Sequence, residues 1–143
     1  MNKFGGKMKV LTIAIMVLRV AVLAALVLGI IFWTGNADNL VPVHMLLGII
    51  VVLSLWVIGL SQGFMKGGSF GMAAATFILG LIVAIVGLSQ QSWLDVSPHW
   101  VIQVIHLLLG LSAIGLGETI YARTRRRLKA AAPPSPIAEN SSI

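Results

Sequence analysis

Two histidines that could bind a metal stand in the same short pattern at two places in the chain. The segments are Val43-His44-Met45-Leu46-Leu47-Gly48 and Ile105-His106-Leu107-Leu108-Leu109-Gly110, so each reads His-x-Leu-Leu-Gly. In a helix, a glycine four residues after a histidine lies on the same face. An imidazole nitrogen is a common metal ligand, and the missing glycine side chain leaves space beside the ring. The repeated pattern therefore predicts a paired site for a metal-centred, flat group.

The second pattern belongs to a longer stripe of polar and small residues. Spacings of three, four and seven put six residues on one face of a helix: His99, Gln103, His106, Gly110, Ala113 and Gly117. A flat or closely packed group should lie along this face. A haem between two imidazoles fits the pattern, because a helix bundle can supply both axial nitrogens and the gap for the macrocycle. We expect His44 and His106 to ligate it, with Gly48, Gly110 and Gln103 beside it and His99 at the rim or near a propionate.

Two other interpretations of the histidines remain open. Each ring could be an interfacial or packed polar residue that donates to a backbone carbonyl or to the other ring, or the pair could bind another metal or relay protons. The first test of a shared site is whether the two histidines lie at the same depth in the membrane. His44 is two residues after Pro42 and His106 eight after Pro98, a mismatch of about 9 Å from the outer ends. Counted from the inner ends, the mismatch is about 3 Å.

The elements that must position these residues are membrane-spanning helices. The chain has 143 residues, of which 58% are hydrophobic and 10% charged, and its mean hydropathy is +1.00. A crossing needs roughly 20 apolar residues, and four apolar runs of that length occur, at about 10–33, 41–62, 69–88 and 98–121. We expect an all-α, integral membrane four-helix bundle over residues 1–129, followed by a disordered cytoplasmic tail over 130–143.

The distribution of charge predicts the orientation of the helices. Lysine and arginine gather before the first run, at Lys66 and after the fourth run, whereas the other two connections carry only Asp38 and Asp95. By the positive-inside rule both termini lie in the cytoplasm, and the protein belongs in the cell membrane. The second and fourth helices then run in the same direction, so the two histidine patterns lie at similar depths. Each pattern follows a polar loop and a first-turn proline, as in a duplicated helical hairpin.

Two charged residues inside the apolar runs predict an ion pair. Arg19 lies deep in the first run and Glu118 near the inner end of the fourth. A charge in the membrane needs a partner or a route to the interface. We expect an Arg19–Glu118 pair, with a propionate or substrate anion as the alternative partner of Arg19.

Composition excludes several classes of function. The chain has no cysteine, which excludes disulfides, thiolate metal sites and cysteine nucleophiles. It has no Ser-His-Asp arrangement, phosphate loop or paired carboxylates, so hydrolytic catalysis is not expected and a redox role is the enzymatic role left open. The net charge of +6 flanks apolar segments, where it indicates orientation and contact with anionic lipid rather than nucleic-acid binding.

The architecture and the two His-x-Leu-Leu-Gly segments loosely resemble the small b-type membrane cytochromes of bacteria, the b561-like group. The resemblance implies haem b held by histidines on inner helices and a role in electron transfer. The chain departs from that group in having one histidine pair, which implies one haem. It also resembles small bacterial four-helix membrane proteins, a likeness that implies no activity.

The sequence therefore predicts an electron-transfer protein, acting with other membrane redox subunits or as a homo-oligomer. The first alternative is a cofactor-free accessory or assembly subunit, whose third helix, rich in glycine and alanine, docks on other membrane helices. The second alternative is a small transporter built on the duplicated hairpins.

Overall fold

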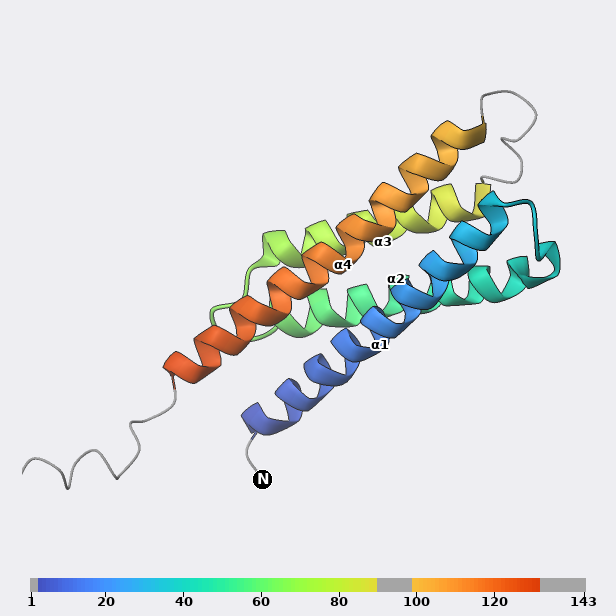
Figure 1. Cartoon of the computed structure of the whole chain (residues 1–143). Coiled ribbons are helices and arrows are strands. Elements are labelled where there is room, and N and C mark those ends of the chain that lie inside the picture. The colour runs from blue at the N-terminus through green and yellow to red at the C-terminus, as the bar shows by residue number, and fades with distance from the viewer. Residues whose placement is uncertain (1–2, 90–98, 132–143) are drawn as a thin grey trace, which may run out of the picture.

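The computed structural model describes residues 3–89 and 99–131, and these residues form a bundle of long helices (Figure 1). The elements are α1 (Lys3–Trp33), the short 3₁₀ helix η1 (Asp38–Leu40), α2 (Val41–Gly63), α3 (Phe70–Ser89) and α4 (His99–Ala130). No strand occurs in the described ranges. The expected all-α four-helix fold is confirmed.

All four helices are long and apolar enough to cross a membrane. The shortest, α3, has 20 residues, which corresponds to about 30 Å of helix and to the thickness of a hydrocarbon core. Side chains along the outer surfaces are large and apolar, as on Ile13, Val20 and Leu23 of α1. A bundle that presents such side chains outward is built for lipid, so the chain is a multi-pass membrane protein.

Two helices are longer than their apolar runs. Helix α1 begins at Lys3 rather than near residue 10, and α4 continues to Ala130 rather than ending near residue 121. Lysine and arginine are good helix formers, and cations in a last turn interact favourably with the helix dipole. Hydropathy therefore located the membrane crossings but not the helix ends. The predicted tail begins inside α4 at Ala130, and residues 132–143 lie outside the described part of the chain.

Proline and glycine set the connection between α1 and α2. Pro42 stands in the first turn of α2, as predicted, where a missing N–H costs no hydrogen bond. The preceding turn uses left-handed backbone at Gly35, with φ of 72°, and at Ala37, with φ of 64°. The first-turn proline predicted for the fourth helix, Pro98, and the loop before it lie outside the described residues.

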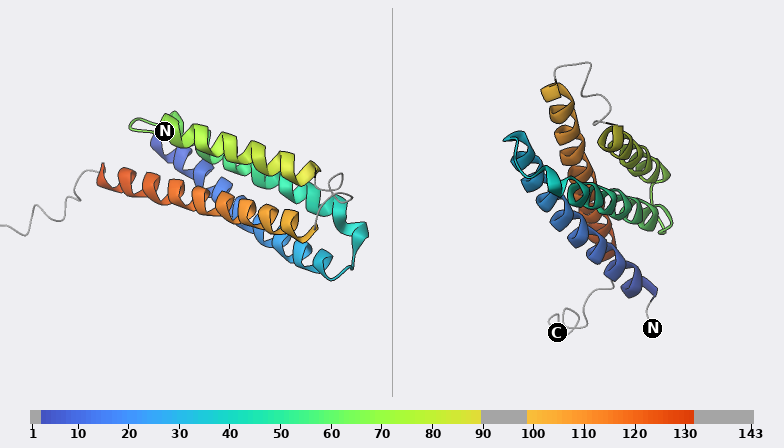
Figure 2. Two further views of the ribbon diagram at one scale, coloured as in Figure 1. Left: turned by 90° about the horizontal axis from the view of Figure 1, so that it is seen from above. Right: turned by 90° about the vertical axis from the view of Figure 1, so that its right-hand side faces the viewer.

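The helices run alternately up and down, so that α1 begins and α4 ends at the same end of the bundle (Figure 2). Helices α2 and α4 accordingly run in the same direction, as expected (Figure 1). Helix α2 contacts each of the other three helices. Helix α4 also contacts the other three helices, and both the core and the site take residues from α2 and α4.

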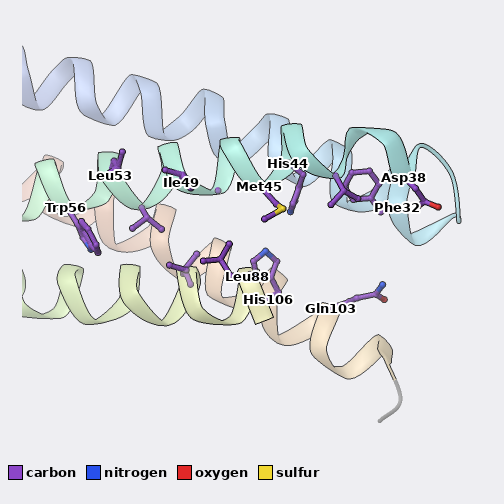
Figure 3. A pocket seen from close by; sticks show the side chains of 16 residues that line it. Phe32, Asp38, His44, Met45, Ile49, Leu53, Trp56, Leu88, Gln103 and His106 are labelled. Carbon is purple, nitrogen blue, oxygen red and sulfur yellow. The ribbon is translucent and has the colours of Figure 1, made fainter. Parts of the chain in front are cut away.

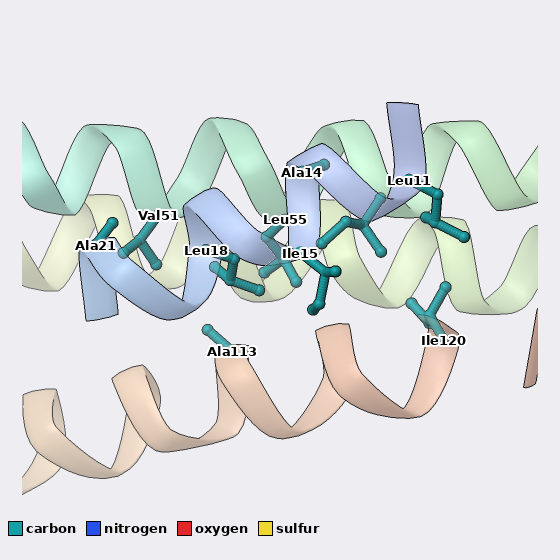
Figure 4. Packing of buried hydrophobic residues seen from close by; sticks show 10 residues of the cluster. Leu11, Ala14, Ile15, Leu18, Ala21, Val51, Leu55, Ala113 and Ile120 are labelled. Atoms are coloured by element: carbon teal, nitrogen blue, oxygen red, sulfur yellow. The ribbon is translucent and has the colours of Figure 1, made fainter. Parts of the chain in front are cut away.

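The tightest packing lies in the half of the bundle that holds the start of α1 and the end of α4. Fully buried apolar side chains meet there from three helices (Figure 4): Leu11, Ile15 and Leu18 of α1, Leu55 and Ile58 of α2, and Ala113 and Ile120 of α4. Gly117 allows this approach, because a methyl group there would lie 2.5 Å from Cδ2 of Leu18. The stripe predicted on α4 thus ends in a close contact with α1.

Helices α2 and α3 approach closely through small residues. A methyl group at Gly59 would collide with the Thr76 side chain, and one at Gly80 would collide with Trp56. Trp56 stacks on Phe77 with ring centroids 4.8 Å apart, and its Nε1 donates to the Phe77 carbonyl. Small residues that admit close helix approach are a regular feature of membrane bundles. Several small residues of α3 are therefore used inside the bundle.

Candidate functional site

His44 of α2 and His106 of α4 face each other across the bundle (Figure 3). Their ring centroids lie 6.1 Å apart, with the ring planes inclined by 55°. Since the residues are 62 positions apart in the chain, only the parallel course of α2 and α4 brings them together. The predicted meeting of the two histidine patterns therefore occurs.

The equal depth of the rings comes from the different starting points of the two helices. His44 lies three residues after the start of α2, and His106 lies seven residues after the start of α4 at His99. The difference of four residues corresponds to about 6 Å of helix rise. Helix α4 projects farther at this end, which absorbs the mismatch counted from the prolines.

Glycines on the two remaining helices lie against the rings. A methyl group at Gly29 of α1 would lie 3.8 Å from Cε1 of His44, and one at Gly87 of α3 would lie 3.2 Å from Cε1 of His106. Contact as close as 3.2 Å would require His106 to shift. Each imidazole is thus held against a backbone surface, and all four helices contribute to the site.

The glycines of the two patterns have a different environment. A methyl group at Gly48 or at Gly110 would meet nothing within 4 Å. Both residues are on the histidine face of their helices, and both line a cavity. The expected gap beside each ring is present.

Two cavities meet at the histidine pair. One, of about 620 Å³, extends on the side of α3 toward Trp56 and Ala84, and the other, of about 310 Å³, extends on the side of α1 toward Ala25. Six residues line both: Phe32, His44, Gly48, Val83, Gln103 and His106. Cavities of this size and apolar lining are typical of small-molecule and cofactor sites. The open space lies on both sides of the line that joins the rings.

Few polar groups serve the site. Nδ1 of His44 and Nδ1 of His106 are buried and make no hydrogen bond with any described residue. Gln103, which also faces the cavities, accepts a hydrogen bond on Oε1 from Nε1 of Trp33. Phe32 packs its edge on His44 at 5.5 Å between ring centroids. The His106 ring is thus held by packing, whereas the His44 ring is held by packing and by a hydrogen bond with the backbone of Ala25.

The geometry suits a metal-centred planar group. Two imidazoles on opposite sides of one metal ion, with bonds of about 2 Å, have their centroids about 6 Å apart. The measured separation of the centroids matches this value, and both histidines line both cavities. Within residues 3–89 and 99–131, no group of three or more His, Cys, Asp or Glu residues forms a metal site. Two nitrogen ligands are the number that a bis-imidazole haem takes from protein.

Of the other predicted site residues, Arg19 and Glu118 form the expected ion pair. The guanidinium donates from Nε to Oε1 at 2.5 Å and from Nη2 to Oε2 at 2.8 Å. Neither residue lines the cavities, so the pair connects α1 to α4 and does not belong to the histidine site. His99 begins α4, and its predicted place at the rim concerns a side chain outside the described part of the structure.

Sequence reasoning missed Gly29, Gly87 and the partner of Gln103. The available signals are weak: Gly29 is the glycine within the apolar run over 10–33, and Trp33 ends that run, where an aromatic residue suits the membrane interface. Which residues of α1 and α3 face α2 and α4 depends on helix rotation, and a single apolar run does not reveal rotation.

Comparison of the chain with protein-family models, with curated proteins and with solved structures finds no match. The function must therefore be argued from the site.

Proposed function

We propose that this protein binds one b-type haem between His44 and His106 and passes single electrons within the membrane. The observation that supports this most directly is the opposed histidine pair, with centroids 6.1 Å apart and a cavity on either side. When bound, the haem would supply reversible one-electron chemistry at its iron.

The residues of the chain would provide ligation, space and a dry environment. Each imidazole would present its unprotonated nitrogen to the iron, and Gly48 and Gly110 would leave room for the macrocycle. Because the rest of the lining is largely apolar, water is kept from the site, which influences the reduction potential. The hydrogen bond from Trp33 holds Gln103, whose amide N–H₂ remains free to donate to a polar edge of the group.

The proposal includes an orientation in the cell membrane, with both termini in the cytoplasm. Lys7, Lys9, Lys66 and the arginines of α4 lie at one end of the bundle, whereas Asp38 lies at the other. The positive-inside rule supports this orientation. The haem would then lie near the outer face, within reach of an electron donor or acceptor on that side or in a partner subunit.

Absorption spectra of the purified full-length protein test the proposal. After expression with ample haem, we expect a Soret band and sharp α and β bands on reduction. His44→Ala and His106→Ala should each lower the haem content at least tenfold, because each variant removes one of the two proposed ligands. His99→Ala removes the third histidine of the chain without removing a proposed ligand, and it should lower the haem content far less than either ligand variant.

A colourless preparation, or unchanged haem content in both ligand variants, would overturn the proposal. The first result would favour the cofactor-free accessory subunit. Thermal unfolding of each variant in detergent should accompany the spectra, so that haem loss can be separated from unfolding.

A further inference from the structure

Eight cations gather at the end of the bundle that lies away from the histidines. They lie on three elements: Lys7 and Lys9 on α1, Lys66 in the α2–α3 loop, and Arg123, Arg125, Arg126, Arg127 and Lys129 on α4. The described acids do not neutralise them, because Glu118 is paired with Arg19 and Asp38 lies at the other end. An anion from the surroundings would complement this charge.

Three of these cations lie in or contact one region, the α2–α3 loop and the first turn of α3. Nη1 of Arg127 donates to the Gly67 carbonyl, and Nη1 of Arg123 contacts Sδ of Met72 at 3.6 Å. Lys66 precedes Gly67 in the loop and its side chain is exposed. We call Lys66, Arg123 and Arg127 the basic seat.

The loop is shaped for this contact by two glycines. Gly67 has left-handed backbone with φ of 74°, and a methyl group at Gly68 would lie 2.8 Å from the Met65 carbonyl oxygen and 3.0 Å from that of Gly63. Side chains are poorly tolerated at both positions. The tight turn leaves its backbone open, so a guanidinium from α4 reaches a carbonyl directly.

The basic seat places like charges together without compensation. Arg123 and Arg127 are four residues apart on one face of α4, a spacing at which like charges repel. The contacts with a carbonyl and a thioether leave both charges unneutralised. A guanidinium has five N–H donors, so each arginine retains donors for a second acceptor. A phosphate oxygen meets this need, because arginine binds phosphate in a forked geometry.

An exposed aromatic side chain stands at each end of the α2–α3 loop. Phe64 directly follows α2 and Phe70 begins α3, and their exposed fractions are 81% and 85%. Exposed aromatic side chains at a helix end suit the interface between headgroups and acyl chains. The loop region thus offers both cations that can bind a phosphate and apolar side chains that can contact an acyl chain.

We propose that the basic seat binds the headgroup of an anionic phospholipid, with its acyl chains along Phe64 and Phe70. The lipid phosphate lies between Arg123, Arg127 and Lys66 and relieves the repulsion between the two arginines. This site is separate from the histidine cavities and does not depend on haem.

Lipid retention and thermal stability test the site. Full-length protein in detergent is incubated with phosphatidylcholine containing phosphatidylglycerol, washed, and analysed for bound lipid by mass spectrometry. The chain should retain phosphatidylglycerol in preference and unfold at a higher temperature with it than with phosphatidylcholine alone. The double variant with Arg123→Gln and Arg127→Gln should lower the retention of phosphatidylglycerol at least tenfold, because each cation near an anionic surface contributes about 1 kcal/mol to binding.

The matched control is Arg125→Gln with Lys129→Gln, which removes the same charge at the same spacing from the opposite side of α4. This control should keep the preference. Lys66→Gln, at an exposed position, should weaken retention without disturbing the Gly67 contact. Equal loss in both double variants would overturn the proposal in favour of diffuse attraction, and equal stabilisation by inorganic phosphate would overturn it in favour of a free-anion site.

Discussion

Glycine has two different roles at the histidine pair. Gly29 and Gly87 lie against the rings, so a side chain there would contact an imidazole. Gly48 and Gly110 face open space instead. The first pair positions the histidines, whereas the second pair leaves a volume that the chain itself does not fill. Substitution of the second pair can therefore block a ligand without disturbing the fold.

Gly48→Leu is the most informative single substitution of this kind. The new side chain enters the space shared by both cavities, so haem content should fall several-fold while the melting temperature of the haem-free protein stays the same or rises. Helix propensity favours leucine over glycine by several tenths of a kcal/mol to about 1 kcal/mol. Absorbance at the Soret band and thermal unfolding measure the two effects. Gly115→Leu, on an exposed part of α4, is the control, and full haem content in the Gly48 variant would contradict the cavity assignment.

At the scale of elements, α2 and α3 approach each other closely at the level of Trp56. The ring of Trp56 covers Gly80 and stacks on Phe77. The glycine and alanine content of the sequence indicated that α3 is rich in small residues, but not which of them face α2. The same applies to α4. Its apolar run predicted the crossing correctly but not the basic extension to Ala130, because lysine and arginine lower hydropathy without breaking a helix.

Gly80→Ala should destabilise this hairpin. The added methyl group would collide with the Trp56 ring, and overpacking of a close contact costs about 1–3 kcal/mol. Thermal unfolding in detergent should show a lower melting temperature. Gly115→Ala, where a methyl group meets nothing within 4 Å, should leave the temperature unchanged or raise it. An equal response at both positions would mean that α2 and α3 do not approach as closely as described.

Across the whole molecule, the buried cluster around Leu18 and Leu55 is concentrated toward the basic end and the cavities toward the histidine end, and the two meet along the middle of α2. The Arg19–Glu118 pair joins α1 to α4 within the spans, and its side chains are 46% and 39% exposed. The densely packed half of the bundle thus adjoins the half whose cavities can receive a cofactor.

The absence of cysteine makes the proposed orientation directly testable. Asn36→Cys places a thiol in the α1–α2 connection, and Lys66→Cys places one at the opposite end. In intact cells a membrane-impermeant maleimide should label the first variant and not the second, whereas both should react after permeabilisation. The opposite labelling pattern would place both termini outside and the histidine pair near the inner face.

The sequence by itself determined the membrane class, the four crossings and the parallel course of α2 and α4, because hydropathy, length and loop charge are local properties that a bilayer acts on directly. It also indicated the histidine pair and the Arg19–Glu118 pair, since polar groups stand out in apolar helices. Only the tertiary structure decided which glycines touch the rings, how far α4 projects, and that Arg123 and Arg127 turn toward the α2–α3 loop. These features depend on the rotation and relative height of packed helices, which are set by contacts between distant parts of the chain.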